Sequence, residues 1–192
     1  MDTTINFSKQ YTYADYLTWA DNMMRELING FVKMMSPAPS AGHQSASMSI
    51  SANIYQHIKK NKGKCKVFAA PFDVRLPING EKADNQIYNV VQPDICVVCD
   101  PSKLDKRGCL GAPDLVIEIQ SFSTARYDLT EKFDLYEKAS VKEYWVVFPY
   151  DEGIEVFLLQ SNGKYDNGTK YERGKVPVHV LEGCEIDIEE IF

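Results

Sequence analysis

The segment DLVIEIQSFSTARYDLTEKFDLYEKASVKEYWVV, residues 114–147, decides the fold class of this chain. It begins with a short run of apolar residues, 114–121, that indicates a strand. Residues 123–141 follow helical spacing, and 142–150 are again apolar and rich in aromatic and β-branched residues. A strand, a helix and a strand in this order are typical of an α/β domain.

The same kinds of element precede this segment. They are predicted to be one helix and two strands, at residues 43–63, 65–77 and 90–100. Met48, Ala52 and Tyr55 fall on one face of the predicted helix, with three isoleucines near it. The complete order, helix, three strands, helix and strand, predicts an α/β fold built on a mixed central sheet.

A chain of 192 residues fits one domain of ordinary size, and no repeat, low-complexity block or linker divides it. Within that domain we expect residues 43–150 to form the core. Residues 1–42 are predicted to be an N-terminal extension, with a short helix and a hairpin that turns at Asn29-Gly30. Residues 151–192 are predicted to add C-terminal strands.

Composition excludes several classes of protein. The formal net charge of −6 argues against a surface that binds nucleic acid all over, although it is compatible with a local basic groove. The sequence contains no run of 18 apolar residues of the kind that predicts a membrane span, and the polar N-terminus lacks a signal-peptide core. We therefore expect a cytoplasmic protein with no membrane partner, whose five cysteines are reduced thiols.

Two carboxylates interrupt the first apolar strand. Side chains alternate along a strand, so Asp114, Glu118 and Gln120 share one face. If the loop 100–113 joins this strand to its neighbour as an antiparallel pair, Asp94 falls opposite the stretch from Glu118 to Gln120. Two acids that meet on one face repel each other unless a divalent cation neutralises them or they share a proton.

Lys132 brings a cation to the same region. On the predicted helix it lies on the flank of the buried face that contains Phe133 and Tyr136, so its ammonium group can reach along the sheet towards Glu118. Acids, a hydrogen-bonding side chain and a Lys around Mg²⁺ suit phosphodiester hydrolysis. The metal polarises the phosphate and lowers the pKa of a water, while the Lys orients that water and stabilises charge in the transition state.

Other interpretations of these residues stay open. From spacing alone a structural role is favoured, because buried charges often belong to ion pairs that hold a fold together. A zinc site is a weaker alternative, since Cys96 and Cys99 point to opposite faces of a strand and no second CxxC or HxxxH pair exists. The sequence also lacks the glycine-rich loops that bind nucleotides and the G-x-S-x-G motif of a serine nucleophile.

The stretch from VVQPDICVVCD (90–100) through residues 111–147 resembles the Uma2 family of restriction-endonuclease-like proteins, also called DUF820. The shared patterns are a proline-aspartate strand, PDLVxEIxSxST and xDxxxKxxxYxxxGVxEYWxV. The resemblance extends upstream to ELINGFVKMMSPAPSAGHQ and downstream to LEGCEIDIEEIF, so it covers nearly the whole chain. It implies the αβββαβ core of the PD-(D/E)xK nucleases, with which the predicted element order agrees.

The resemblance also implies a set of catalytic residues. Asp94 matches the acid of the first proline-aspartate strand, and Glu118 matches the first acid of the (D/E)xK element, which implies that both bind the metal. Gln120 occupies the place where that motif has Lys, and would orient the metal shell or the water. Lys132 on the following helix matches the position of a substitute Lys, and Ser140 stands where the family usually has Gly.

Three further residues are candidates for a supporting role near this centre. Asp114 lies one strand step from it. Asp73 is either a further acid near the site or a partner of Arg75 or of a turn amide. His43 could approach the metal or the phosphate, but we favour a capping or packing role for it.

We therefore expect a nuclease that uses Mg²⁺ or Mn²⁺ to hydrolyse DNA, with Asp94, Glu118, Gln120 and Lys132 at its centre. Two alternatives are a module that binds nucleic acid or protein and has lost efficient chemistry, and a structural protein that works as a dimer. Nucleases of this fold often pair so that two sites face two strands, and the resemblance therefore implies a homodimer.

Overall fold

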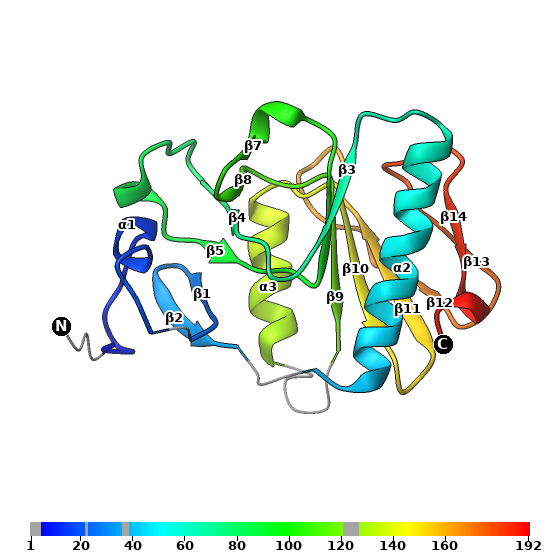
Figure 1. Ribbon diagram of the computed structural model, residues 1–192, viewed down its shortest axis with the longest axis horizontal. Coiled ribbons are helices and arrows are strands. Elements are labelled where there is room, and N and C mark those ends of the chain that lie inside the picture. Colours follow the sequence, from blue (N-terminus) through cyan, green and yellow to red (C-terminus); the bar gives the residue numbers. More distant parts are fainter. Residues whose placement is uncertain (1–4, 22, 36–38, 121–126) are drawn as a thin grey trace.

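The computed structural model describes residues 5–21, 23–35, 39–120 and 127–192 (Figure 1). Its centre is a six-stranded sheet with the strand order β12-β11-β10-β9-β6-β3. In that order the strands are Thr169–Tyr171, Gly153–Leu158, Glu143–Phe148, Leu115–Ile119, Ile95–Val98 and Lys66–Ala69. β9 and β10 are parallel, and the other neighbouring strands of this sheet are antiparallel, so the sheet is mixed as predicted.

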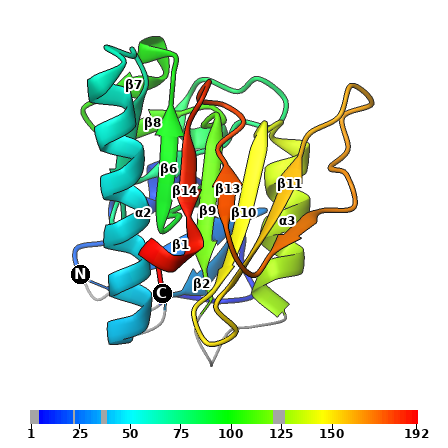
Figure 2. The same ribbon diagram turned by 90° about the vertical axis from the view of Figure 1, so that its right-hand side faces the viewer.

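The two long helices cover opposite faces of this sheet (Figures 1 and 2). α2, Ala41–Lys60, lies on the face to which Ile117 points, and α3, Tyr127–Lys138, lies on the face to which Val116 points. Side chains alternate along β9, so Glu118 points to the α3 side, as Val116 does. The helix that carries Lys132 therefore covers the face that carries the acid.

The apolar face of α2 differs from the expected one. The buried residues of the helix are His43, Ala46, Ile50, Ile54 and Ile58. Met48 and Tyr55, by contrast, are 71% and 53% exposed. At the α-helical rotation per residue they lie roughly 100° or more from Ile54, the middle of the isoleucine row, so the two sets occupy different sides of the helix. The isoleucines repeat every four residues and form the longer continuous stripe, and the sheet packs against that stripe.

α3 ends in a turn that takes Ser140 into the left-handed region, with φ of 64°. Ser140 N donates to Glu137 O, and Val141 N donates to Tyr136 O, both at 3.0 Å, which is the hydrogen-bond pattern of a Schellman cap. Glycine adopts that backbone conformation most readily because it has no Cβ. A glycine is therefore the expected residue at this position, and Ser140 departs from it.

A second six-stranded sheet joins the N-terminal hairpin to the core, with the order β2-β1-β5-β4-β8-β7. In that order its strands are Phe31–Met34, Arg25–Ile28, Val90–Val91, Val74–Arg75, Gly108–Leu110 and Leu104–Asp105. β1 and β2 form the predicted hairpin, in which Asn29 and Gly30 have φ of 51° and 82°. Leu27 of β1 pairs with Val90 of β5, so the N-terminal extension is tied to the core by the backbone of this sheet.

Two of the predicted strands are divided between the two sheets. The segment 65–77 supplies β3 and β4, and the segment 90–100 supplies β5 and β6. Pro71 and Pro93 lie at the divisions, and a proline has no amide hydrogen with which to continue a ladder. The predicted loop 100–113 also differs from the structure, because it contains β7 and β8.

The remaining elements complete the chain. They are α1 (Tyr13–Tyr16), the short 3₁₀ helices η1 (Asp84–Gln86), η2 (Pro101–Lys103) and η3 (Ile188–Glu190), and the strands β13 (Lys175–Pro177) and β14 (Glu185–Asp187). β13 and β14 pair with each other and belong to the same hydrophobic cluster as α2. Among the described residues, no helix has the length and apolar character needed to cross a membrane.

The expectation of reduced thiols is wrong for two of the cysteines, because Cys65 and Cys99 form a disulfide. In the antiparallel pair β3–β6, Lys66 is opposite Val98, so the next pair outward is Cys65 and Cys99. This proximity follows from the register of two strands and not from the cysteine spacing. The other three cysteines, Cys96, Cys109 and Cys184, are buried and free.

Candidate active site

Asp94 and Glu118 lie opposite each other on neighbouring strands. The antiparallel pair β6–β9 aligns Ile95 with Ile117, and the next position of that register aligns Asp94 with Glu118. Asp94 Oδ2 accepts a hydrogen bond from Ile119 N at 2.7 Å, which fixes the carboxylate against the end of β9. The predicted antiparallel pairing is therefore confirmed.

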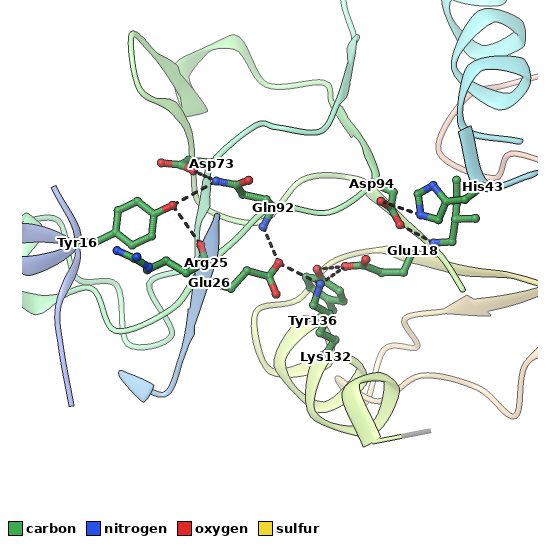
Figure 3. Close-up of polar contacts among 11 residues, drawn as sticks. Tyr16, Arg25, Glu26, His43, Asp73, Gln92, Asp94, Glu118, Lys132 and Tyr136 are labelled. Carbon is green, nitrogen blue, oxygen red and sulfur yellow. Dashed lines mark hydrogen bonds and ion pairs between the residues drawn. The ribbon is translucent and has the colours of Figure 1, made fainter. Parts of the chain in front are cut away.

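Lys132 and Tyr136 reach the carboxylate of Glu118 from α3 (Figure 3). Lys132 Nζ donates to Glu118 Oε1 at 3.1 Å, and Tyr136 OH donates to the same oxygen at 2.6 Å. The two donors are four residues apart, so both side chains leave the helix on the same side. The predicted reach of Lys132 to Glu118 is confirmed. Both of these hydrogen bonds use Oε1, so in the part of the chain that the structure describes Oε2 of Glu118 is left for a further partner.

His43 approaches Asp94 from the first turn of α2. Its Nε2 lies 3.2 Å from Asp94 Oδ1, and this hydrogen bond raises the pKa of His43, against the opposing effect of burial. His43 is buried in α2, as the packing alternative expects, but it does not cap the helix. The cap is Ser40, whose Oγ accepts from the backbone N of His43, while the imidazole contacts the acid. The other ring nitrogen, Nδ1, is buried and has no hydrogen-bond partner among the described residues.

Gln120 follows β9, and its backbone N donates to Val147 O at 2.8 Å. Its side-chain Oε1 is buried and has no hydrogen-bond partner in the part of the chain that the structure describes. A buried carbonyl oxygen left without a partner costs about 1–3 kcal/mol. Gln120 is therefore suited to accept a ligand that the protein itself does not supply.

Glu26 of β1 also belongs to this cluster, although it was not among the predicted site residues. It is 5% exposed, and its Oε1 accepts from Lys132 Nζ at 3.0 Å and from Gln92 N at 2.8 Å. Figure 3 shows Lys132 with one carboxylate on either side, Glu26 and Glu118. The only local signal is an acid inside the otherwise apolar end of a hairpin strand, and the pairing of β1 with β5 brings it to the site.

Gln92 links Glu26 to a further acid, Asp73. The Nε2 atom of Gln92 donates to Asp73 Oδ1 at 2.8 Å and to Tyr16 OH at 3.2 Å. Asp73 is thus connected to the cluster through one intervening residue, because the backbone N of Gln92 donates to Glu26 and its side chain donates to Asp73 (Figure 3). The alternative partner, Arg75, forms its ion pair elsewhere.

Asp114 is not brought together with these residues. It precedes β9, whereas Glu118 lies near the end of the strand. Its Oδ2 accepts from Cys99 N at 2.7 Å, and its Oδ1 pairs with Lys142 Nζ at 2.7 Å. These contacts tie the start of β9 to the segments that follow β6 and precede β10, which is a structural role.

Burial and shared charge perturb the ionisation of the cluster. Burial raises the pKa of Glu118 to about 7, and the neighbouring ammonium group of Lys132 opposes that rise. Burial alone would lower the pKa of Lys132, but the carboxylates of Glu118 and Glu26 raise it above its ordinary value. Burial also holds the pKa of Tyr136 well above its ordinary value, so the phenol remains a hydrogen-bond donor. Lys132 is therefore a cation at neutral pH.

The donor atoms at this end of the sheet fit a hard divalent cation. Asp94 and Glu118 offer carboxylate oxygens and Gln120 offers its unpartnered carbonyl oxygen, and Mg²⁺ and Mn²⁺ prefer oxygen ligands. Within the described residues, no three or more His, Cys, Asp or Glu side chains are grouped so that they could hold a metal ion. Mg²⁺ commonly takes one or two carboxylates and completes its shell with water and phosphate, so two acids suffice as the protein's share.

A cavity of about 550 Å³ lies apart from these residues. Its lining comes from the β1–β2 hairpin, the segment 76–89 and one side of α3, and includes Lys33, Asn89 and Leu135. Neither Asp94, Glu118 nor Lys132 lines it. The candidate site is therefore a cluster of side chains at the end of the central sheet and is not this cavity.

Comparison with known proteins gives one family and one relative of similar length. The family model Uma2, described as "Putative restriction endonuclease", matches residues 13–189. The "Uncharacterized protein slr1290" of Synechocystis sp. is 25% identical over 154 residues, which make up 79% of this chain and 75% of that protein.

A solved structure has the same fold. It is described as a "putative nuclease belonging to DUF820" from Anabaena variabilis, and it matches this chain with a TM-score of 0.74 and 19% sequence identity. The match covers 95% of this chain and 97% of that one. The predicted restriction-endonuclease-like α/β fold therefore agrees with a solved relative over nearly the whole chain.

Proposed function

The chain belongs to the Uma2 family, and on that premise we propose that it is a metal-dependent nuclease that hydrolyses DNA phosphodiester bonds. One observation carries the proposal. Lys132 Nζ donates to Glu118 Oε1 at 3.1 Å, and Glu118 lies opposite Asp94 in the sheet. Two acids and a cation on one face supply the charges that metal-assisted phosphodiester hydrolysis needs.

Asp94 and Glu118 would hold Mg²⁺ or Mn²⁺, and the free oxygen of Gln120 would bind either the metal or a water on it. When bound, the metal polarises the phosphate and lowers the pKa of a water molecule. Tyr136 keeps the head group of Glu118 in place through its 2.6 Å hydrogen bond. Glu118 can then present Oε2 without losing its anchor at Oε1.

Lys132 supplies positive charge beside the reacting phosphate. A protonated amine has three donors, and within the described residues two of them are used by Glu26 and Glu118, so one remains for a water or a phosphate oxygen. A cation in that place orients the attacking water and stabilises the charge that develops in the transition state. Lys132 would thus have, on a helix, the catalytic role that the Lys of a (D/E)xK element has on the strand.

His43 would orient Asp94 without touching the substrate. Asp94 receives His43 Nε2 at one oxygen and Ile119 N at the other, so both ends of the carboxylate are held. Each oxygen keeps a second lone pair for a metal ligand bond. The carboxylate therefore stays in one orientation before a metal ion arrives.

Titration calorimetry with Mg²⁺ or Mn²⁺ tests this site. The native protein is expected to bind the metal, and Glu118→Ala is expected to remove that binding. Glu131→Ala is the matched control, because Glu131 is an acid of α3 that pairs with Lys33 and is outside the cluster. Binding that survives Glu118→Ala unchanged would exclude Glu118 as a ligand.

A second candidate function is a module of the same fold that binds nucleic acid or protein without cleaving DNA. Gln120, which stands in the place of the motif Lys, is the observation that favours it. Cleavage of labelled DNA separates the two functions. Cleavage that disappears in Lys132→Ala supports the enzyme, whereas DNA binding without any cleavage supports the module.

We propose further that the active form is a homodimer. Two copies related by a two-fold axis could present one site to each strand of a duplex. Light scattering on the purified protein tests this: a mass of two chains is expected, and a mass of one chain at working concentration would contradict it.

A further inference from the structure

The ammonium group of Lys132 lies between two carboxylates that come from different sheets. Glu26 Oε1 accepts from Lys132 Nζ at 3.0 Å, and Glu118 Oε1 accepts at 3.1 Å (Figure 3). Glu118 belongs to β9 of the central sheet, while Glu26 belongs to β1 of the N-terminal hairpin. The two contacts are nearly equal in length, so Lys132 has two anchors and not one.

Glu26 is held more firmly than a surface carboxylate. Its side chain is 6% exposed, and its Oε1 also accepts from the backbone N of Gln92 at 2.8 Å. The side chain of Gln92 in turn donates to Tyr16 OH, and Tyr16 OH donates to the carbonyl of Arg25, the residue before Glu26. Glu26 is therefore fixed to the backbone on its far side and leaves its charge directed at Lys132.

The proposed function places different demands on the two anchors. A metal ion on Glu118 would draw on the negative charge that now attracts Lys132, and the cation itself would repel the ammonium group. Lys has a flexible four-carbon stem, so a Lys with one weakened anchor can leave the site. Glu26 is no part of the proposed metal shell and keeps its full charge when the metal arrives.

The charges around Lys132 also favour different roles for its two anchors, Glu26 and Glu118. The groups that face it are the carboxylates of Glu26 and Glu118 and the phenols of Tyr136 and Tyr144, and Asp94 and His43 lie beyond Glu118. Two carboxylates thus contact Lys132, and a third carboxylate with one imidazole lies behind Glu118. A divalent cation can bind among these carboxylates without displacing the ammonium group of Lys132, provided that one carboxylate still pairs with Lys132.

The geometry points to Glu26 as the positioning residue for Lys132: it holds the ammonium group at the reaction centre while Glu118 binds the metal. This inference rests on the proposed function and adds to it a residue from the N-terminal hairpin. The function of that hairpin would then be to position Glu26, a residue of the second sheet, beside Lys132.

Kinetics with three variants test the inference in the active enzyme. Glu26→Gln keeps the shape and the acceptor oxygen but removes the charge, and it is expected to lower kcat about 10²-fold with little change in the KM for DNA. Glu26→Asp keeps the charge and is expected to recover part of the loss. Glu131→Gln removes a charge from the residue of α3 that directly precedes Lys132, and it is expected to leave kcat unchanged. Equal rates for Glu26→Gln and the native enzyme would overturn the inference.

Nitrogen-15 NMR of the lysine ammonium groups gives a readout that needs neither activity nor metal. A Lys ammonium signal that is slow to exchange is seen only when the group is held, and Lys132→Arg identifies the signal of Lys132. Glu118→Gln imitates a Glu118 whose charge is engaged. The signal is expected to persist in Glu118→Gln and to vanish in the double variant Glu26→Gln/Glu118→Gln.

The two proposals can fail separately. Absence of metal binding and of DNA cleavage in the native protein would contradict the proposed function, and the NMR comparison would still decide whether Glu26 anchors Lys132. A Lys132 signal that persists in the double variant would overturn the inference about Glu26, whatever the enzyme assays give.

Discussion

Lys132 Nζ lies 3.1 Å from Glu118 Oε1 although the two residues are fourteen positions apart in the chain. In a (D/E)xK element the Lys is two positions from the acid, on the same strand. In the proposed site that place holds Gln120, and the cation comes from the following helix. The contact shows that a helix packed on the sheet can bring a cation to the acid that lacks its usual neighbour.

Moving the cation back to the strand is the sharpest test of that relationship. Lys132→Gln is expected to lower the rate of DNA cleavage about 10²–10³-fold, because a preorganised charge at the transition state is lost. Gln120→Lys, added to Lys132→Gln, is expected to recover part of the rate, since the backbone of Gln120 continues the ladder to β10 and alternation then puts position 120 on the face of Glu118. Lys138→Gln, on the same helix, serves as the control and is expected to have no effect. A double variant as slow as the single one would show that position 120 cannot supply the cation.

Mg²⁺ is expected to stabilise the protein through the candidate site. A ligand that binds only the folded state at 100 times its Kd adds about 2.7 kcal/mol to the free energy of unfolding. Thermal unfolding of the native protein should therefore shift upward as Mg²⁺ is added. The shift should disappear in Asp94→Asn and in Glu118→Ala. An undiminished shift in both variants would place the metal elsewhere on the protein.

The ionisation of Glu118 predicts how stability depends on pH when divalent metals are removed. Burial raises its pKa from 4.5 to about 7 in the folded state. Between these two values the folded state binds the proton and the unfolded state does not, so this group makes the protein less stable as pH rises through that window. Glu118→Gln removes the effect, and its amide oxygen can still accept from Tyr136 and Lys132.

We therefore expect Glu118→Gln to match the native protein in stability near pH 4.5 and to be more stable than it at pH 8. Urea unfolding in the presence of a chelator, with both proteins measured at each pH, gives the difference in the free energy of unfolding. A variant that is less stable than the native protein at pH 8 would show that ion pairing at Glu118 outweighs the cost of its burial.

The end of α3 offers a prediction about stability alone. Ser140 has φ of 64°, a conformation that costs a residue with a Cβ about 1–2 kcal/mol, whereas glycine adopts it freely. Glycine loses about 0.4–1 kcal/mol through the greater freedom of the unfolded chain. Ser140→Gly should therefore raise the free energy of unfolding by about 0.5–1 kcal/mol, and Ser140→Ala should not. A destabilised Ser140→Gly protein would contradict this account of the cap.

The central part of the fold could be predicted from the sequence because its signals are local. The spacing in α2 and α3, the apolar runs of β9 and β10 and the Asn29-Gly30 turn each lie within one element. The opposition of Asp94 and Glu118 followed from a single further step, an antiparallel pairing across one connection. The contact of Lys132 with Glu118 could be predicted in the same way, since the position of Lys132 on the helix decides which face it borders.

The rest depended on contacts between segments far apart in the chain. Pro71 and Pro93 divide two predicted strands between two sheets, and no local pattern shows which piece joins which sheet. Glu26 reaches Lys132 only because β1 pairs with β5, and its separation from Lys132 is 106 positions. The disulfide Cys65–Cys99 likewise requires the register of β3 and β6. Each of these features belongs to tertiary structure and not to any single segment.

The most direct test of the account is the rate of cleavage of end-labelled duplex DNA by the purified protein in Mg²⁺. It should be measured with and without a chelator, and beside Glu118→Gln and the control Glu131→Gln. We expect cleavage by the native protein and by Glu131→Gln that stops when the metal is removed, and no cleavage by Glu118→Gln. Cleavage that continues in Glu118→Gln or in the chelator, or no cleavage by the native protein on any DNA, would contradict a metal-dependent nuclease centred on Asp94, Glu118 and Lys132.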